Sequence, residues 1–304
     1  MASQRFTDAE ITYFDQQAAQ WIHEDSTWRE WFPAKTIPMS RWTEWKILEE
    51  INDAAATMDG SRTALAASSY QTGEAQLIWF GHHFIWSELE VETARNTGNQ
   101  ISTEEIRLAY QRINKQIARL IINGNMAWEA PTVAGITAGS TDAGATALDW
   151  EDAGGPYAHM VFGYSILTAL GYEPPFRLIC SQNLRAGLAA EHTAGYPTSA
   201  RVAIAEAFEL EGIHFEGVAA AAATEHDIVC YPFIVPAADD GRWLLMKSDP
   251  NNFSILEVFP PKLTIVPEMD IKARSYYGRL DWLGTVKIVH ADAVTDEDSV
   301  DLQT

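Results

Sequence analysis

Few residues of this sequence could do chemistry, and none has the spacing of a known catalytic or metal site. His82 and His83 form the one adjacent histidine pair, in an aromatic and β-branched stretch that predicts a strand. Neighbouring side chains of a strand point to opposite faces, so the two imidazoles cannot easily share a metal ion and are interpreted as structural. Cys180 and Cys230 lack a nearby histidine or a CxxC partner, which leaves a nucleophilic or zinc-binding role unsupported. We expect Cys180 to be a core residue of its strand.

The remaining motifs each lack a part that their chemistry needs. The chain has no Gly-Lys dipeptide and so no phosphate-binding P-loop, and residues 163–165 lack the second glycine of a nucleophile elbow. Asp239 and Asp240 precede Gly241, a pattern that predicts a hairpin turn. Residues 249–252 lack the spaced ligands and the distal glutamate of a calcium loop and also predict a turn. We therefore expect no catalytic residue, no metal site, no cofactor and no enzymatic activity.

Composition narrows the class of protein further. The 304 residues include 42 acidic and 21 basic side chains, for a formal net charge of -21, which argues against binding nucleic acid or anionic membrane through neutralised phosphates. The acid excess fits either simple solubility or a saline habitat, and both interpretations stay open. Two cysteines exclude a disulfide framework, and no signal peptide or membrane-spanning run is apparent. We expect a folded, soluble protein made inside the cell.

The N-terminal third predicts a docking helix followed by a loop. Residues 7–31 form an amphipathic pattern that Thr7 and Glu10 open as a capping box, and its many tryptophans favour docking on its own domain or on a neighbouring copy. Residues 34–75 are less regular. Trp42, Trp45, Leu48 and Ile51 have roughly helical spacing, whereas residues 54–75 have no core pattern and must find their order through contacts elsewhere.

One long helix is the clearest element of the chain. Residues 103–122 repeat apolar side chains at three-and-four spacing, Ser102 and Glu105 form an apparent capping box, and Asn123-Gly124 ends the pattern. Before it, residues 76–86 predict a strand broken at Gly81, and residues 87–98 a short helix. We expect Ile113 and Ile117 to pack under the strands of residues 253–292.

The rest of the chain predicts a mixed α/β region and then β-strands. Four β-rich runs separated by proline or glycine occupy residues 253–292, and the acidic residues 294–304 are interpreted as a solvated or disordered tail. The α/β region predicts strands at 158–164, 176–181, 213–218, 227–235 and 242–247, and helices at 165–171, 183–191 and 201–212.

The order of these elements resembles the Hong Kong-97 capsid fold, shared by major capsid proteins of tailed viruses of bacteria or archaea and by encapsulin shell proteins. HHFIWSELEVETARNTGNQIST is similar to the strand, short helix and loop before the spine helix of that fold, and EEIRLAYQRINKQIARLIINGN, followed by VAGIT, to the spine helix itself. GGPYAHMVFGYSILTAL is similar to the first strand and helix of the axial domain. Residues 253–294 are similar to the returning peripheral strands with their alanine-valine close, so the likeness spans residues 76–294.

The resemblance implies an α+β fold divided in a known way. Six parts are expected: an N-terminal arm at 1–35, an extended loop with flanking strands at 36–86, a peripheral domain at 87–130 with return strands at 257–293, an axial domain at 131–256, and an acidic tail at 294–304. No scaffolding segment precedes the capsid domain in this sequence, and no cross-linking lysine and asparagine are identified.

The resemblance also implies a function. It is that of a major capsid protein, whose pentamers and hexamers assemble into an icosahedral capsid around double-stranded DNA, without sequence-specific contact and without a membrane partner. Portal, scaffolding or cement proteins are further implied partners, and the implied location is the virion capsid, assembled in the host cytoplasm. Two alternatives stay open. One is an encapsulin nanocompartment around a cargo enzyme, and the other is an α/β enzyme with a cryptic site in residues 131–256.

Overall fold

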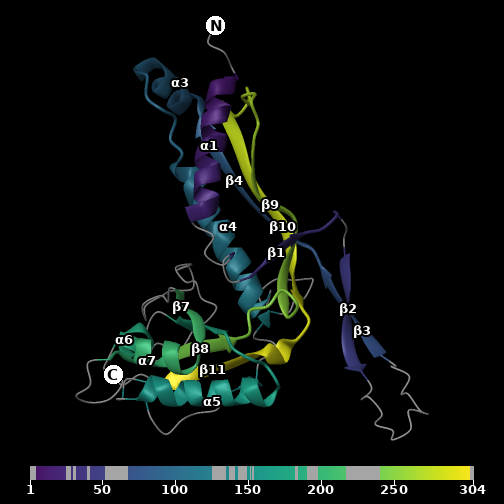
Figure 1. Ribbon diagram of the computed structural model, residues 1–304. Coiled ribbons are helices and arrows are strands. Elements are labelled where there is room, and N and C mark those ends of the chain that lie inside the picture. The colour runs from purple at the N-terminus through teal and green to yellow at the C-terminus, as the bar shows by residue number, and fades with distance from the viewer. Residues whose placement is uncertain are drawn as a thin grey trace, which may run out of the picture.

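The computed structural model of the chain has an elongated upper body, a lower body at one end of it, and a hairpin that projects to one side (Figure 1). The two bodies are built on separate sheets of four and five strands, and the hairpin is a third sheet of two strands. The structure describes residues 5–24, 29, 32–39, 42–51, 68–124, 135–136, 141–142, 149–150, 152, 154–181, 184–189, 198–216 and 240–301.

The upper body is a four-stranded sheet with helices packed on one face. Its strands run in the order β1-β9-β10-β4, with β1 parallel to β9 and the other neighbours antiparallel. The strands are β1 (Ala34–Thr36), β4 (Ile78–Ser87), β9 (Phe253–Ile265) and β10 (Ser275–Ile288), and the helices are α1 (Asp8–Glu24), α3 (Glu88–Thr97) and α4 (Glu104–Asn123).

The lower body is a mixed five-stranded sheet in the order β5-β11-β8-β6-β7. The short 3-10 helix Ala291–Ala293 leads from β10 of the upper body into β11 of this sheet. The strands are β5 (Thr141–Asp142), β6 (Phe176–Ser181), β7 (Leu210–Glu216), β8 (Asp240–Met246) and β11 (Val294–Asp301), and the helices are α5 (Gly155–Ala169), α6 (Arg185–Ala189) and α7 (Ala200–Ala207).

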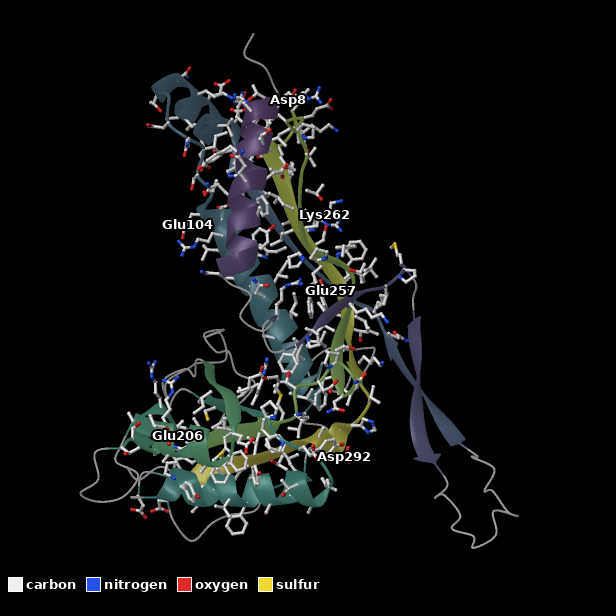
Figure 2. All side chains as sticks on the ribbon, in the orientation of Figure 1. Asp8, Glu104, Glu206, Glu257, Lys262 and Asp292 are labelled. Atoms are coloured by element: carbon white, nitrogen blue, oxygen red, sulfur yellow. The ribbon has the colours of Figure 1, made fainter. Side chains whose placement is uncertain are left out.

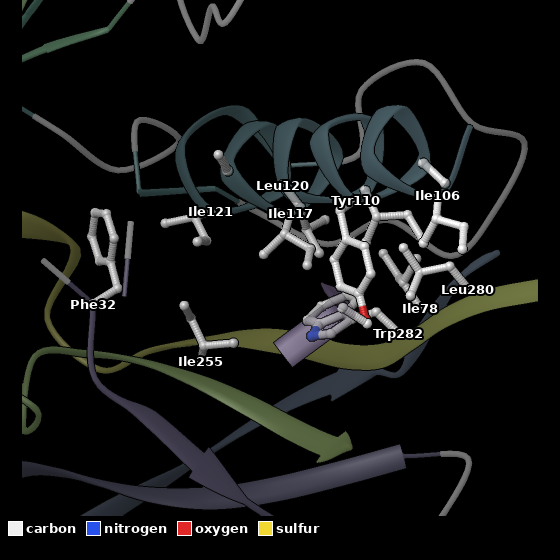
Figure 3. Packing of buried hydrophobic residues seen from close by; sticks show 14 of the residues in the cluster. Phe32, Ile78, Ile106, Tyr110, Ile117, Leu120, Ile121, Ile255, Leu280 and Trp282 are labelled. Atoms are coloured by element: carbon white, nitrogen blue, oxygen red, sulfur yellow. The ribbon is translucent and has the colours of Figure 1, made fainter. Parts of the chain in front are cut away.

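The predicted long helix is confirmed as α4, and its apolar stripe lies on the four-stranded sheet (Figure 3). Ile113 is 3% exposed and Ile117 is fully buried, and α4 contacts β4, β9 and β10. The predicted cap is wrong. The N-cap is Thr103, which makes no side-chain capping hydrogen bond, while Ser102 is exposed and its carbonyl accepts a hydrogen bond from Trp86 Nε1 at 3.1 Å. The chain turns into α4 one residue later than the capping-box pattern indicated.

The N-terminal helix docks on its own body. Thr7 caps α1 as predicted, since Glu10 N donates to Thr7 Oγ1 at 3.3 Å and Thr7 N donates to a Glu10 carboxylate oxygen at 2.7 Å. The α1 ring of Phe14 stacks on Trp86 of β4 with centroids 5.1 Å apart. Arg95 of α3 closes a bidentate pair with the Glu10 carboxylate, both contacts at 2.9 Å. The later part of the helix predicted over 7–31 lies largely outside the described residues.

Three expected breaks in the upper sheet are absent. β4 runs continuously through Gly81, where a Cβ would come 3.0 Å from Asp281 Oδ1, so glycine allows a close approach there and does not interrupt the strand. The four predicted β-rich runs are two long strands, β9 and β10. The proline pair at 260–261 lies inside β9 and coincides with register shifts against β10, because proline cannot donate to a ladder.

Two segments have the opposite secondary structure to the one their spacing predicted. Residues 42–51, with roughly helical spacing, form strand β2 (Trp42–Ile51), which pairs with β3 (Ser68–Gln76). Residues 158–164, predicted as a strand, belong to the single helix α5. The helix predicted at 201–212 ends at Ala207, and its last residues begin β7. The strand predicted at 227–235 lies outside the described residues.

The prediction that the acidic tail is solvated is wrong for residues 294–301. These residues form β11, which pairs with β5 on one side and β8 on the other. Val294 and Thr295 are fully buried, and Glu297 is 4% exposed. Residues 302–304 lie outside the described residues. An acidic segment can form an inner strand of this sheet because the lower body provides hydrogen-bond partners for the buried Glu297 carboxylate.

Replacing Ile113 with alanine should lower the free energy of unfolding by about 2–5 kcal/mol, because the side chain is buried in mid-helix and leaves a cavity. Ser102→Ala is the matched control and should change it by less than about 0.5 kcal/mol, since an exposed side chain that caps nothing is lost. Urea unfolding of the unassembled subunit measures both. Equal costs for the two variants would contradict the packing of α4.

The Glu10–Arg95 pair should make stability depend on acid. The hydrogen bond from Arg95 lowers the pKa of Glu10 from 4.5 to about 2. A carboxylate with a lowered folded-state pKa stabilises the fold above about pH 4.5, and this contribution is lost as the pH falls towards 2. Glu10→Gln should therefore flatten the loss of thermal stability across this window, whereas Glu206→Gln, at an exposed position of α7, should leave it unchanged. An unaltered pH profile for Glu10→Gln would refute the pairing.

Candidate self-assembly surfaces

The structure does not bring the chemically interesting residues together. His82 and His83 lie on β4, His82 half-buried and His83 exposed, as expected for neighbours in a strand. Arg112 Nη1 of α4 lies 3.4 Å from His82 Nε2, and burial, followed by this positive charge, lowers the pKa of His82. Both features favour a neutral, structural imidazole. No cluster of three or more His, Cys, Asp or Glu side chains suited to a metal ion occurs among the described residues.

The other predicted residues have packing or turn roles. Cys180 is buried in β6, and burial raises the pKa of its thiol far above the usual range. Gly163 lies in α5, where a Cβ would come 2.8 Å from the Trp243 ring. The Asp249 carboxylate accepts a hydrogen bond from Asn251 N at 2.7 Å, so residues 249–252 form the predicted turn. The hairpin turn predicted at residues 239–241 is wrong for Asp240 and Gly241, which begin β8 and pair with β11, and Asp239 lies outside the described residues.

Two buried carboxylates were not anticipated from the sequence. Glu297 of β11 accepts hydrogen bonds from Trp243 Nε1 at 3.0 Å and from His159 Nδ1 at 2.6 Å, with His159 and Glu297 each about one-twentieth exposed. This contact joins α5, β8 and β11 and fixes the last strand in the lower sheet.

Glu257 fixes the N-terminal segment to the upper sheet in a similar way. It lies within β9, in the middle of the elongated body, as Figure 2 shows. The two carboxylate oxygens each lie 3.0 Å from a guanidinium nitrogen of Arg29. The Glu257 carbonyl also accepts a hydrogen bond from Ile37 N at 2.8 Å. Its position in the apolar run FSILEVF was the one signal in the sequence, because a lone acid in a buried strand needs a partner.

The hairpin of β2 and β3 is the most prominent surface for contact with another molecule. It projects from the side of the upper body (Figure 1), and its two strands form a sheet of their own. The pairing extends from Trp42 opposite Gln76 to Ile51 opposite Ser68. Among the described residues no third strand pairs with it. A two-stranded sheet is marginally stable in water unless it packs on something else.

The face of the upper sheet opposite α4 carries an exposed aromatic and charged cluster. Trp79 is about half exposed, and its Nε1 donates to Asp281 Oδ1 at 2.8 Å. The Arg279 guanidinium lies 5.0 Å from the centre of the Trp79 ring and donates to the same carboxylate at 2.6 Å. Phe259 meets the Trp79 ring edge-on at 6.1 Å. Aromatic and arginine side chains of this kind are typical of protein–protein contacts.

The far end of the upper body exposes aliphatic side chains. Leu89 of α3 is 76% exposed, and Ile271, in the turn between β9 and β10, is 69% exposed. An ion pair of 2.6 Å between Glu88 and Arg274 ties α3 to this turn. This end of the body thus carries two exposed aliphatic side chains among charged residues. No described helix is both long and apolar enough to cross a membrane.

Comparison with known proteins identifies this architecture. No protein-family model matches the sequence, and no curated protein matches it by sequence. A virus-like particle from Pyrococcus furiosus has a similar structure, with a TM-score of 0.60, 12% identity, and 93% of this chain and 97% of that chain covered. The capsid of Myoviridae phage XM1 superposes with a TM-score of 0.61, 12% identity and coverage of 90% and 92%.

A chain from Mycobacterium phage Ogopogo is equally similar, with a TM-score of 0.61, 11% identity and coverage of 90% of this chain and 91% of that chain. The chain has the Hong Kong-97 capsid fold. The predicted α+β class is confirmed, as is the resemblance on which it rested. Because these likenesses extend over about nine-tenths of each chain, the hairpin, the upper body and the lower body belong to one architecture.

Removing the buried Glu297 carboxylate should destabilise the lower body strongly. Glu297→Ala leaves the buried Trp243 and His159 nitrogens without this acceptor, and we expect a loss of about 3–5 kcal/mol in the free energy of unfolding. Glu211→Ala breaks the Arg177–Glu211 pair, whose carboxylate is half exposed, and should cost at most about 1 kcal/mol. Urea unfolding compares the two variants, and similar losses would show that Glu297 does not hold β11.

Proposed function

We propose that the protein is the major capsid protein of a tailed virus and that it assembles into an icosahedral capsid enclosing the viral genome. The observation that carries this proposal is the projecting β2–β3 hairpin on a Hong Kong-97 fold. Half of the ten residues of β2, WTEWKILEEI, are apolar, although the hairpin has no third described strand. A neighbouring subunit provides the surface on which such a hairpin becomes stable.

The finer features follow from the same proposal. Pentamers and hexamers form the shell, the upper body is the peripheral domain, and the lower body, including β11, is the axial domain. With a net charge of -21, the chain encloses double-stranded DNA without sequence-specific contact. Portal, scaffolding or cement proteins are additional partners, and assembly takes place in the host cytoplasm. The chain has no enzymatic role in this scheme.

An encapsulin nanocompartment is the second candidate. It is supported by the similarity to the Pyrococcus furiosus particle, because the superposition covers 97% of that particle's chain. The N-terminal helix α1, which packs on α4, is a second supporting feature. In this case the shell holds a cargo enzyme in place of a genome.

Electron microscopy of the purified protein, combined with its ultraviolet absorbance ratio, tests the proposal. Closed shells that contain nucleic acid are the expected result for particles purified from the virus host. Small shells filled with protein would favour the encapsulin. A protein that stays monomeric by light scattering at high concentration, with and without salt, would overturn both.

Shortening the hairpin should abolish assembly and leave the subunit folded. Trp42 lies opposite Gln76, so an Asn-Gly turn can join these two residues in place of residues 43–75. Because the upper-body core is made by other elements, we expect an unchanged cooperative thermal transition and a monomeric or remodelled product. The control replaces only residues 54–65 with a linker of equal length and keeps both strands. Loss of the thermal transition in the shortened variant would place the hairpin in the subunit core.

A further inference from the structure

The strand β4 forms an outer edge of the upper sheet. It is the last strand in the order β1-β9-β10-β4, and no described strand pairs with its outer side. Gly81, which has no side chain, is exposed, so the backbone of β4 itself reaches solvent at this point. An open edge displays backbone N–H and C=O groups in a row, and the group that satisfies such a row is another strand.

The two edges of this sheet differ in sequence. The ten residues of β4, IWFGHHFIWS, include no Asp, Glu, Lys, Arg or Pro, whereas every other described strand carries at least one charged side chain. At the opposite edge, β1 has only three residues, one of them Lys35, and β9 continues with Pro260, Pro261 and Lys262. Short strands, lysine and proline prevent one edge from pairing with another. The edge of β4 has none of these and is left able to pair.

Half-exposed apolar side chains lie on both faces beside this edge. Trp79 is 49% and Ile85 50% exposed on the face away from α4, because alternate residues of a strand point to opposite faces. Leu108 of α4 is 42% exposed. It lies on the flank of the helix nearest β4, since Arg112 Nη1, one turn further on, is 3.4 Å from His82 Nε2. We call the outer edge of β4 with these three apolar side chains the β4 edge patch.

The strand in the β4 edge patch is complementary to itself. Residues that lie opposite each other in an antiparallel sheet point to the same face, so pairing two copies of β4 about His82 puts Trp79 opposite Ile85. Aromatic and β-branched side chains form favourable cross-strand pairs, and a two-fold axis gives two of them. The same register puts Gly81 opposite His83, where the glycine leaves room for the imidazole.

The charges on the flank of α4 have the same symmetry. Glu105 and Arg112 lie on either side of Leu108, three and four residues away, and the charges of both act on His82. Neither forms an ion pair with another described residue. When a second α4 runs antiparallel about Leu108, the Glu105 of each copy lies beside the Arg112 of the other.

We infer that the β4 edge patch is a two-fold contact between two copies of this chain, in which the two β4 strands pair antiparallel and join the upper sheets into one. The inference rests on the proposed function, because a closed shell needs contacts that join one ring of subunits to the next. Charge selects the occupant. Two copies that each carry -21 repel each other, but here a strand without Asp, Glu, Lys or Arg meets itself and the flanking charges pair. A surface that meets itself lies on a two-fold axis, so the contact is between rings.

A charge-exchange series on α4 tests the contact. Glu105→Arg and Arg112→Glu each place like charges in both predicted pairs, so each should lower the yield of closed shells at least about tenfold and leave isolated rings. The double variant Glu105→Arg/Arg112→Glu restores opposite charges across the axis and should restore the shells. Arg107→Glu, exposed on the other flank of α4, has the same net charge as Arg112→Glu and should assemble normally. Native mass spectrometry and electron microscopy distinguish rings from shells.

Other outcomes would overturn the inference. Normal shells from either single variant, or no recovery in the double variant, would mean that Glu105 and Arg112 do not meet across an axis, and would leave the shell function standing. Equal failure of Arg107→Glu would trace the effect to net charge and refute the contact. If a single variant loses thermal stability, Ile85→Lys decides, because lysine on an edge strand blocks pairing without changing α4, and normal shells from it would refute the contact. A wild-type protein that forms neither rings nor shells would overturn the proposed function as well.

Discussion

The short passage from β10 to β11 is the constraint on which the rest of the structure depends. Within residues 289–293 the chain passes from β10, an inner strand of the upper sheet, to β11, an inner strand of the lower sheet. Hydrogen bonds hold this passage at both ends, from Val289 N to the Asn252 carbonyl at 2.8 Å and from Lys247 N to the Ala293 carbonyl at 3.0 Å. Ile179, Leu244 and Met246 of the lower sheet belong to the same apolar cluster as the stripe of α4. One continuous core therefore fixes the two bodies relative to each other.

The candidate contact surfaces lie on the hairpin and on the upper body. The Trp79 cluster and the exposed side chains of Leu89 and Ile271 lie on different parts of the upper body. Weak contacts of this kind become decisive when symmetry repeats each of them many times. The buried carboxylates have partners within the chain, Glu257 in Arg29, Asp281 in Arg279 and Glu297 in the nitrogens of His159 and Trp243. Repulsion then disfavours contacts that bring acidic faces of two copies together.

The parts that could be predicted from sequence are those whose pattern is completed within one subunit. α4 was predictable because one face packs on the sheet and the other is polar, which is the condition under which three-and-four spacing becomes visible. β11 was not, since an acidic strand becomes acceptable only through His159 and Trp243, which lie 138 and 54 residues away in sequence. Residues 158–164 of α5 were misassigned because apolar residues occupy both the buried and the exposed side of this helix, which hides its three-and-four spacing. The candidate surfaces were therefore visible only after the fold was known.

The central place of β11 has a consequence for how the protein is made. The ribosome delivers residues 294–301 after every other described strand, yet they lie between β5 and β8. A chain that terminates before this strand therefore leaves the edge of β8 open and the indole of Trp243 without its acceptor. Such a chain lacks the strand that joins β5 to β8 in the lower sheet. The lower body is therefore the last part of the described fold that can be completed as the chain is made.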